Sequence, residues 1–171
     1  MSKRIAVTGP ESTGKSTLSA QLAAHFQTVW VPEYARAYLD QLPRPYVADD
    51  ILAIAQGQVE REKQLASQAD RLLISDTELL VTKVWSEHAF GHCPEWILEA
   101  LAHQHYDLYL LTGTDVPWEP DPQREHPHLR DYFYQCYRRE LESRQWPFVE
   151  IWGEPSVRLE KAIRAVEKVL G

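Results

Sequence analysis

Short apolar runs alternate with longer amphipathic stretches along the 171 residues of this chain. The apolar runs are rich in aliphatic and β-branched residues, and they predict strands at 4–8, 28–31, 72–75, 108–112 and 148–152. Apolar residues with a helical repeat fill the intervals and predict helices at 15–25, 47–69, 77–89, 95–104, 129–144 and 154–170. Because the strand runs lack polar alternation, we expect both faces of the sheet to be covered. The pattern therefore predicts an α/β fold, a five-stranded parallel sheet with helices on both faces.

The segment 114–128 interrupts this alternation. Its four prolines, at 117, 120, 122 and 127, exclude a regular helix across it. Long irregular loops in compact domains are commonly functional lids or disordered. The charged and aromatic residues of this loop favour a lid that covers a binding site. No repeat, low-complexity tract or linker divides the remaining sequence, so we expect residues 1–171 to form one domain that carries this lid.

Composition excludes several classes of partner. A hydrophobic content of 44% and a charged content of 25% are ordinary for a globular domain. The net charge of −7 argues against a nucleic acid held through its phosphates. Cys93 and Cys136 are too few for a disulfide framework or a metal cluster, and no signal peptide or membrane-spanning run is present. We therefore expect a cytoplasmic protein with no membrane partner, and the oligomeric state stays open.

Residues 9–17 carry the strongest chemical signal. Two glycines, Gly9 and Gly14, stand five positions apart and are followed by Lys15 and Ser16, between a predicted strand and a predicted helix. The glycines let successive backbone N–H groups turn inward and cradle phosphate oxygens at a helix N-terminus. Lys15 supplies a positive charge to the β- and γ-phosphates, and the Ser16 hydroxyl is a ligand for Mg²⁺. The motif predicts a phosphate-binding loop (P-loop) and hence a P-loop NTPase or kinase fold that binds ATP and Mg²⁺. A turn before an ordinary helix is the alternative.

Asp76 ends the predicted strand at 72–75. In P-loop folds an acid at this position lies beside the loop and helps to hold Mg²⁺. Asp is also a good N-cap for a helix that begins at Thr77, and the two roles are compatible.

Glu33 and Arg36 follow the second predicted strand. Ligands of open parallel sheets bind beyond the carboxyl ends of the strands, so both side chains are expected to face the phosphates. Glu33 is a candidate base for the proton of an attacking hydroxyl, and Arg36 is a candidate to orient the acceptor or Glu33. A solvated helix start with an acidic first turn is the alternative.

The lid segment adds cations. Arg124 and Arg130 are placed to reach over a bound triphosphate and stabilise charge that develops during transfer, with Arg124 the preferred candidate. Asp121 lies close by in sequence, and Trp118 offers a flat face for an aromatic ring. A loop of solvated charges is the alternative. The other tryptophans, including Trp85, are expected to anchor the core or the helix packing.

Together these motifs resemble the ribosylnicotinamide kinase domain of the NadR family, a kinase domain of the AAA_28 grouping. The resemblance covers nearly the full chain in the same order. Pro122 stands where the family lid has Gly, and the His-x-Gly-His signature of the family's nucleotidyltransferase domain is absent, so the chain looks like a stand-alone kinase domain. The matching motifs are residues 9–17, 31–36, 56–58, Asp76-Thr77, Thr82 and 115–118 with Asp121 and Arg124.

The resemblance implies transfer of the ATP γ-phosphoryl group to the ribose 5′-hydroxyl of nicotinamide riboside, giving nicotinamide mononucleotide. The expected catalytic residues are Lys15, Glu33, Asp76 and Arg124, with either carboxylate as base and Glu33 preferred. Ser16 and Asp76 are expected to hold the metal. Loop residues expected to bind ATP are Gly9, Glu11, Ser12, Thr13, Gly14, Lys15, Ser16 and Thr17; residues expected to bind the acceptor are Glu33, Tyr34, Arg36, Gln58, Asp76 and Trp118.

Two other functions stay open. One is a kinase for another nucleoside or nucleotide. The other is a nucleotide-binding sensor or switch, against which the sequence speaks because it lacks an Asn-Lys-x-Asp motif and an Asp-x-x-Gly after the third strand.

Overall fold

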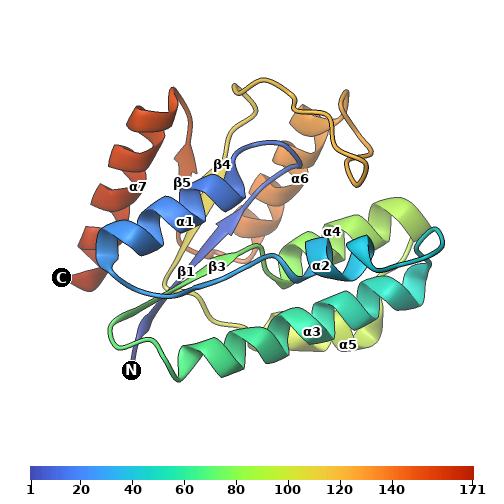
Figure 1. The fold of residues 1–171 in the computed structure, drawn as a ribbon, viewed down its shortest axis with the longest axis horizontal. Coiled ribbons are helices and arrows are strands. Elements are labelled where there is room, and N and C mark those ends of the chain that lie inside the picture. The colour runs from blue at the N-terminus through green and yellow to red at the C-terminus, as the bar shows by residue number, and fades with distance from the viewer.

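Five parallel strands form the centre of the computed structural model, which describes residues 1–171 (Figure 1). Their order in the sheet is β2-β3-β1-β4-β5, which confirms the predicted five-stranded parallel sheet. Four strands match their predicted ranges closely. The second shrinks to two residues because it is an edge strand that pairs only with Ile74 and Ser75 of β3. The strands are β1 (Lys3–Thr8), β2 (Trp30–Val31), β3 (Leu72–Asp76), β4 (Leu108–Thr112) and β5 (Phe148–Ile151).

Seven helices surround the sheet, one more than the sequence predicted. The extra helix is α2, Tyr34–Asp40, which has seven residues and buries none of them fully. Without a buried stripe it has no apolar repeat to detect. The other helices are α1 (Lys15–Phe26), α3 (Ala48–Ala66), α4 (Leu79–Phe90), α5 (Glu95–His103), α6 (Arg130–Ser143) and α7 (Pro155–Leu170).

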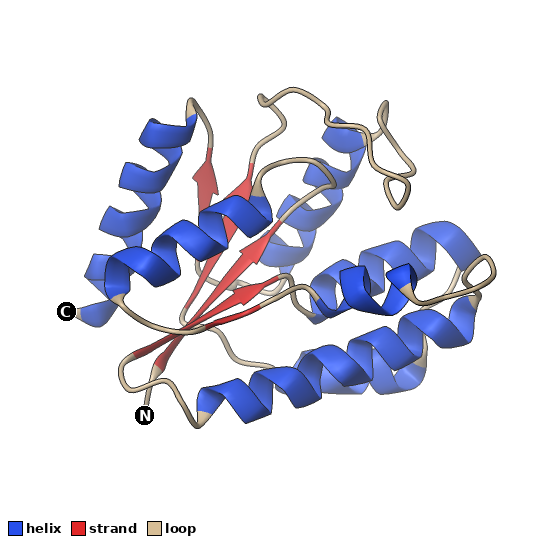
Figure 2. Cartoon of the chain, in the orientation of Figure 1, coloured by secondary structure: helices blue, strands red, loops and turns tan.

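The helices lie in two layers, with α1 and α7 on one face of the sheet and α3, α4, α5 and α6 on the other (Figures 1 and 2). Neighbouring residues of a strand point to opposite faces, so Ile5 and Val7 pack under α1 and α7 while Ala6 packs under the second layer. Both sets are fully buried, which explains why the strand runs show no polar alternation.

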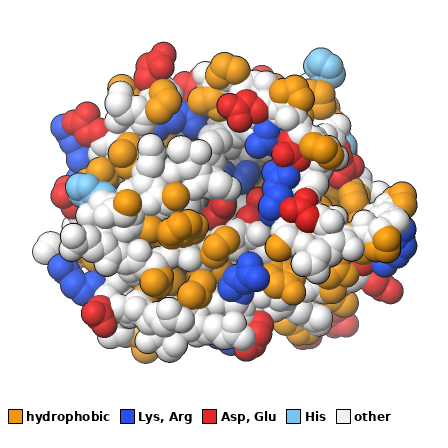
Figure 3. All heavy atoms as spheres, in the orientation of Figure 1, with side chains coloured by type: hydrophobic (Ala, Val, Ile, Leu, Met, Phe, Trp, Pro, Cys, Tyr) orange, Lys and Arg blue, Asp and Glu red, His pale blue; other side chains and the backbone are white.

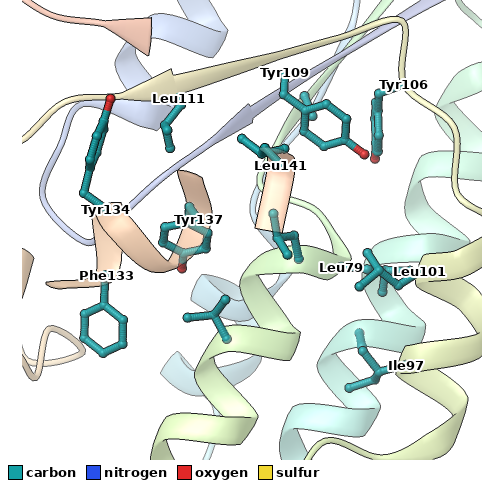
Figure 4. Packing of buried hydrophobic residues seen from close by; sticks show 14 of the residues in the cluster. Leu79, Ile97, Leu101, Tyr106, Tyr109, Leu111, Phe133, Tyr134, Tyr137 and Leu141 are labelled. Atoms are coloured by element: carbon teal, nitrogen blue, oxygen red, sulfur yellow. The ribbon is translucent and has the colours of Figure 1, made fainter. Parts of the chain in front are cut away.

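The larger core lies between β4 and the helices α4, α5 and α6. Figure 4 shows Tyr109 and Leu111 of β4 on the same side of the sheet as Tyr137 and Leu141 of α6. Burying a side chain of this size stabilises the fold by about 1.5–3 kcal/mol each. This packing fixes α4 and α6 beside the sheet, where they form one wall of the cavity described below.

The carboxyl ends of the central strands meet at one edge of the sheet. Val7 is in register with Asp76, and Thr8 with Leu111, so the segments that follow β1, β3 and β4 leave the sheet side by side. Open parallel sheets bind ligands at this edge. The P-loop, Asp76 and the lid segment (residues 114–128) therefore start from neighbouring positions.

Candidate active site

The P-loop has the backbone that its glycines predict. Gly9 and Gly14 have φ angles of 142° and 82°, a region that other residues rarely adopt. A Cβ on Gly9 would lie 2.6 Å from the Thr112 hydroxyl oxygen, so no larger residue fits there. The Thr13 hydroxyl donates to the Pro10 carbonyl at 2.7 Å and lies 2.7 Å from the Thr112 hydroxyl. Thr112, the last residue of β4, thus packs directly against the P-loop.

Lys15 lies folded back over the same loop. Its ammonium group donates to the carbonyl oxygens of Gly9 at 2.9 Å and of Pro10 at 2.7 Å. Burial lowers the pKa of Lys15, and the carboxylates of Glu33 and Asp76 oppose that shift. The negative charges of these two acids therefore act on the lysine, and an incoming phosphate would compete with the carbonyl oxygens for its three donors.

Asp76 and Ser16 form the contact that the metal prediction requires. The Ser16 hydroxyl donates to Asp76 Oδ2 at 2.6 Å, while the buried Oδ1 has no hydrogen-bond partner. Burial raises the pKa of Asp76 to about 6, with the negative charge of Glu33 adding to the effect. A buried carboxylate oxygen without a partner is costly, and a cation relieves that cost. A hydroxyl and a carboxylate are also oxygen ligands of the kind that Mg²⁺ prefers, so the residues fit this ion.

The N-cap of α4 is Glu78, not Asp76. Glu78 accepts a hydrogen bond from the Leu80 backbone N–H at 2.7 Å, and its other oxygen accepts one from Thr8 at 3.2 Å. Between the two acids, Thr77 has a φ of 69°, which is unusual for a β-branched residue and costs about 1–3 kcal/mol. Backbone strain of this kind is common at functional sites. The capping role considered for Asp76 belongs to its neighbour, and Asp76 stays available to the P-loop.

Glu33 lines the same cavity as Lys15 and Ser16 and is the N-cap residue of α2. Its side chain makes no capping hydrogen bond. Arg36, one turn further on, does not orient Glu33 but donates to Asp121 Oδ1 of the lid segment at 2.7 Å. The alternative of a plain solvated helix start does not describe this arrangement, because Glu33 and Arg36 both line the cavity.

Tyr34 and Gln58 lie outside the cavity lining. The Tyr34 ring rests against Gly57, where an added Cβ would lie 2.2 Å from a ring carbon. The Tyr34 backbone N–H donates to Gln58 Oε1 at 2.8 Å, and the buried Gln58 Nε2 has no partner. The glycine at position 57, in the middle of α3, therefore leaves the room that α2 needs to pack against α3.

The lid segment lies against the P-loop. Glu11 accepts hydrogen bonds from the backbone N–H groups of Glu125 at 3.1 Å and His126 at 3.2 Å. Ser12 Oγ accepts one from the Glu119 backbone N–H at 2.8 Å. Glu11 and Ser12 were both expected to bind ATP. The lid segment therefore forms hydrogen bonds with two residues of the expected nucleotide site.

The two arginines that were expected to reach over the triphosphate differ in position. Arg124 lines the cavity and donates to the Glu119 carbonyl oxygen. Arg130 is the first residue of α6 and donates to the carbonyl oxygens of Ser12 at 2.9 Å and Val116 at 2.8 Å. Trp118 is not part of the lining; its ring lies 5.7 Å from the Arg130 guanidinium carbon.

A cavity of about 440 Å³ joins these groups. Its polar half is made by the P-loop, Glu33, Arg36 and Arg124. Figure 3 shows a hollow in this face of the molecule, with acidic and basic side chains gathered around it. The opposite wall is mostly apolar and comes from α4 and α6: Val81, Val84, Trp85, His88, Phe133 and Tyr137.

Arg158 is a site residue that sequence reasoning missed. It lies on α7, is only 5% exposed, and donates to the carbonyl oxygens of Thr13 at 2.7 Å and Gly113 at 2.9 Å. It also pairs with Asp115 at 2.5 Å. These contacts tie the P-loop to the segment after β4. Nothing in the local sequence of α7 marks this arginine, because its partners lie far away along the chain.

An all-parallel sheet with a P-loop at its carboxyl edge defines a nucleotide-binding α/β domain of the P-loop class. The chain belongs to the AAA_28 family (AAA domain), whose model matches residues 4–158. This finding confirms the resemblance stated from the motifs.

Individual relatives point the same way. The chain is 25% identical over 178 residues to the trifunctional NAD biosynthesis/regulator protein NadR of Escherichia coli K12, and 27% identical over 128 residues to that of Salmonella typhimurium LT2. These matches cover 99% and 71% of this chain but only 43% and 31% of the relatives. The chain therefore spans less than half the length of these curated proteins.

Solved structures extend the comparison. A NadR protein in complex with NAD and AMP-PNP superposes with a TM-score of 0.78 at 26% identity, covering 99% of this chain and 50% of that one. A NadR protein in complex with NR gives 0.83 at 23% identity, covering 99% and 51%. Deoxyadenosine kinase from M. mycoides gives 0.67 at 13% identity over 96% of this chain and 99% of that one, which shows a shared fold.

Two general observations bound the site. None of the seven helices is long and apolar enough to cross a membrane. No cluster of three or more His, Cys, Asp or Glu side chains is arranged to hold a metal. A magnesium site here would use Ser16 and Asp76 together with phosphate oxygens of the nucleotide, as is usual for this ion.

Proposed function

We propose that this protein is an ATP-dependent kinase that phosphorylates the ribose 5′-hydroxyl of nicotinamide riboside. One observation carries the proposal: a single cavity brings the P-loop together with Glu33 and with an apolar wall large enough for a second, ring-bearing substrate. A sensor or switch needs no room for an acceptor, so the second half of the cavity favours a transferase.

The donor phosphates bind in the P-loop. Residues 9–17 offer backbone N–H groups at the N-terminus of α1, where the helix dipole favours negative charge. Lys15 exchanges its carbonyl contacts for the β- and γ-phosphates. Arg124 lines the cavity and stabilises the negative charge on the oxygens of the phosphoryl group during its transfer.

Ser16 and Asp76 would hold Mg²⁺ with the phosphates. The metal, when bound, neutralises charge on the transferring group. Asp76 is prepared for this role because its Oδ1 is buried and has no other partner.

Glu33 is the proposed base. Asp76 already accepts from Ser16 and has a metal to hold, whereas the Glu33 carboxylate faces the cavity without a capping bond. Glu33 takes the proton of the 5′-hydroxyl as the acceptor oxygen bonds to the γ-phosphorus. The bond between that phosphorus and the β–γ bridging oxygen breaks, and ADP leaves with the electron pair.

The choice of acceptor rests on the relatives. NadR proteins are named for NAD biosynthesis, and their solved structures contain NR or NAD with AMP-PNP. The shared fold of deoxyadenosine kinase supports nucleoside phosphorylation more generally. Nicotinamide riboside is therefore the first acceptor to test, and an ordinary nucleoside is the second.

The test measures ADP release with a panel of acceptors at fixed concentrations of ATP and Mg²⁺. Nicotinamide riboside, adenosine, deoxyadenosine, cytidine and uridine are compared by kcat/KM. We expect the highest value for nicotinamide riboside. Equal or higher values for the other nucleosides would overturn the acceptor, and ATP binding without acceptor-dependent turnover would overturn the kinase.

A further inference from the structure

The hydroxyl of Tyr137 is a polar group in the mostly apolar wall of the cavity, and the proposed chemistry does not use it. This residue lies on α6, two turns beyond the lid segment, and is only 5% exposed. It lines the cavity together with Phe133 of the same helix and Val84 and Trp85 of α4. Figure 4 shows its ring between β4 and α4, with the hydroxyl on the side away from Leu111.

Other buried tyrosines of this core have protein partners. Tyr106 donates to Glu62 at 2.5 Å, and Tyr134 donates to Glu150 at 2.5 Å. Tyr137 makes no side-chain hydrogen bond, and burial together with the negative charges of Glu78 and Glu11 raises its pKa. Its hydroxyl therefore stays protonated, with a free donor beside the cavity. The hydroxyl is not among the fully buried polar atoms that lack a partner, so it can be reached from the cavity, where a ligand can supply an acceptor.

The wall around this hydroxyl suits a flat ring. Val84, Trp85 and Phe133 offer aliphatic and aromatic surface, and Tyr46 packs edge-on against Trp85 with ring centroids 5.0 Å apart. The sequence predicted that Trp85 anchors the core or the helix packing. Its ring packs against the core and also lines the cavity. Trp118, the ring partner expected from the lid, lies outside this wall.

From this geometry we infer that Tyr137, Trp85 and Phe133 form the subsite for the base of the acceptor, and that the Tyr137 hydroxyl donates a hydrogen bond to a carbonyl oxygen on that base. The inference rests on the proposed kinase function and adds a specificity residue to it. For nicotinamide riboside the partner is the carbonyl oxygen of the exocyclic carboxamide. A riboside that carries the same ring without that group loses this bond and keeps the apolar contacts.

The test pairs two variants with two ligands. Tyr137→Phe removes only the hydroxyl, and Tyr132→Phe removes a half-exposed hydroxyl from the same helix outside the cavity. Binding of nicotinamide riboside and of the pyridinium riboside that lacks the carboxamide is measured by isothermal titration in the presence of AMP-PNP and Mg²⁺. ADP release with ATP is measured for the same protein samples.

We expect Tyr137→Phe to weaken nicotinamide riboside binding by about 3- to 10-fold and to leave the pyridinium riboside unchanged. Tyr132→Phe should alter neither. An equal loss for both ligands would assign Tyr137 a structural role and overturn the inference, and so would no loss for either.

Binding and turnover separate the two proposals. If the wild type binds nicotinamide riboside with the expected pattern but releases no ADP, the proposed function fails and the subsite stands. If it releases ADP with nicotinamide riboside and Tyr137→Phe binds both ligands normally, the function stands and the subsite fails. If the wild type does not bind nicotinamide riboside, both fail.

Discussion

Arg36 of α2 and Asp121 of the lid segment form an ion pair of 2.7 Å that joins two elements of the cavity wall. A second contact supports it, because Gln123 Nε2 donates to the Arg36 carbonyl oxygen at 3.2 Å. Glu33 stands immediately before α2. The lid segment therefore contacts the helix that directly follows the proposed base, and under the proposed function a movement of the lid segment would shift Glu33 relative to the acceptor.

Breaking this pair should reduce activity more than stability. The Arg36 and Asp121 side chains are 42% and 26% exposed, so their bond adds only about 0–1 kcal/mol to folding. We expect Asp121→Asn to lower kcat/KM for the acceptor by about 10-fold through misplacement of α2, with a melting temperature near that of the wild type. Glu160→Gln removes a comparable exposed ion pair, with Arg164 on α7, and should leave kcat/KM unchanged. Equal kinetics in both variants would contradict the coupling.

Replacing Asp76 should separate metal binding from folding. Asp76→Asn keeps the shape of the side chain and removes the charge that Mg²⁺ requires. We expect kcat to fall by about 100-fold or more, in the range for loss of a single electrostatic contact to the transition state, and the Mg²⁺ concentration for half-maximal activity to rise. Thermal stability without metal should be retained, because the variant no longer buries an ionisable group. Unchanged Mg²⁺ dependence would contradict the metal role.

Much of the fold could be predicted from the sequence because its strands and most helices carry local signals. The apolar run at 72–74 predicts a strand, and the glycines of the P-loop predict a turn, without reference to any distant residue. Helix α2 has no buried side chain, so its position depends on contacts with Gly57 and the lid segment. Such contacts between distant residues are not encoded in a local pattern.

The site divides in the same way. Lys15, Ser16 and Asp76 could be placed because a loop and a strand end have fixed geometry at the edge of a parallel sheet. Arg158 and Tyr137 could not, since each sits in an ordinary amphipathic helix and gains its role from the cavity it faces. The ion pair of Arg36 with Asp121 spans 85 residues and was likewise beyond sequence reasoning.

A side chain at Gly57 should disturb α2. An added Cβ would lie 2.2 Å from the Tyr34 ring, closer than atoms can approach. We expect Gly57→Ala to destabilise the protein by about 1–3 kcal/mol, as overpacking usually does, despite the better helix propensity of alanine. Urea unfolding measures the change. In a Tyr34→Ala background the ring is absent, and the same substitution should become neutral or stabilising. A loss of equal size in both backgrounds would show that Tyr34 is not the obstacle.

Stability in mild acid should depend on Asp50, which lies in the first turn of α3. Hydrogen bonds from Arg44, the Val47 backbone N–H and Tyr38 hold the pKa of this carboxyl below its ordinary value of 3.8. The unfolded chain then binds more protons than the folded one below about pH 4, so the contribution of Asp50 is present above that pH and is lost as the pH falls. We expect wild type to exceed Asp50→Asn in unfolding free energy at pH 7 and 5, and the gap to narrow at pH 3. Asp49→Asn removes an exposed carboxylate from the same turn and should show no such narrowing. A gap for Asp50→Asn that stays constant from pH 7 to pH 3 would contradict the lowered pKa.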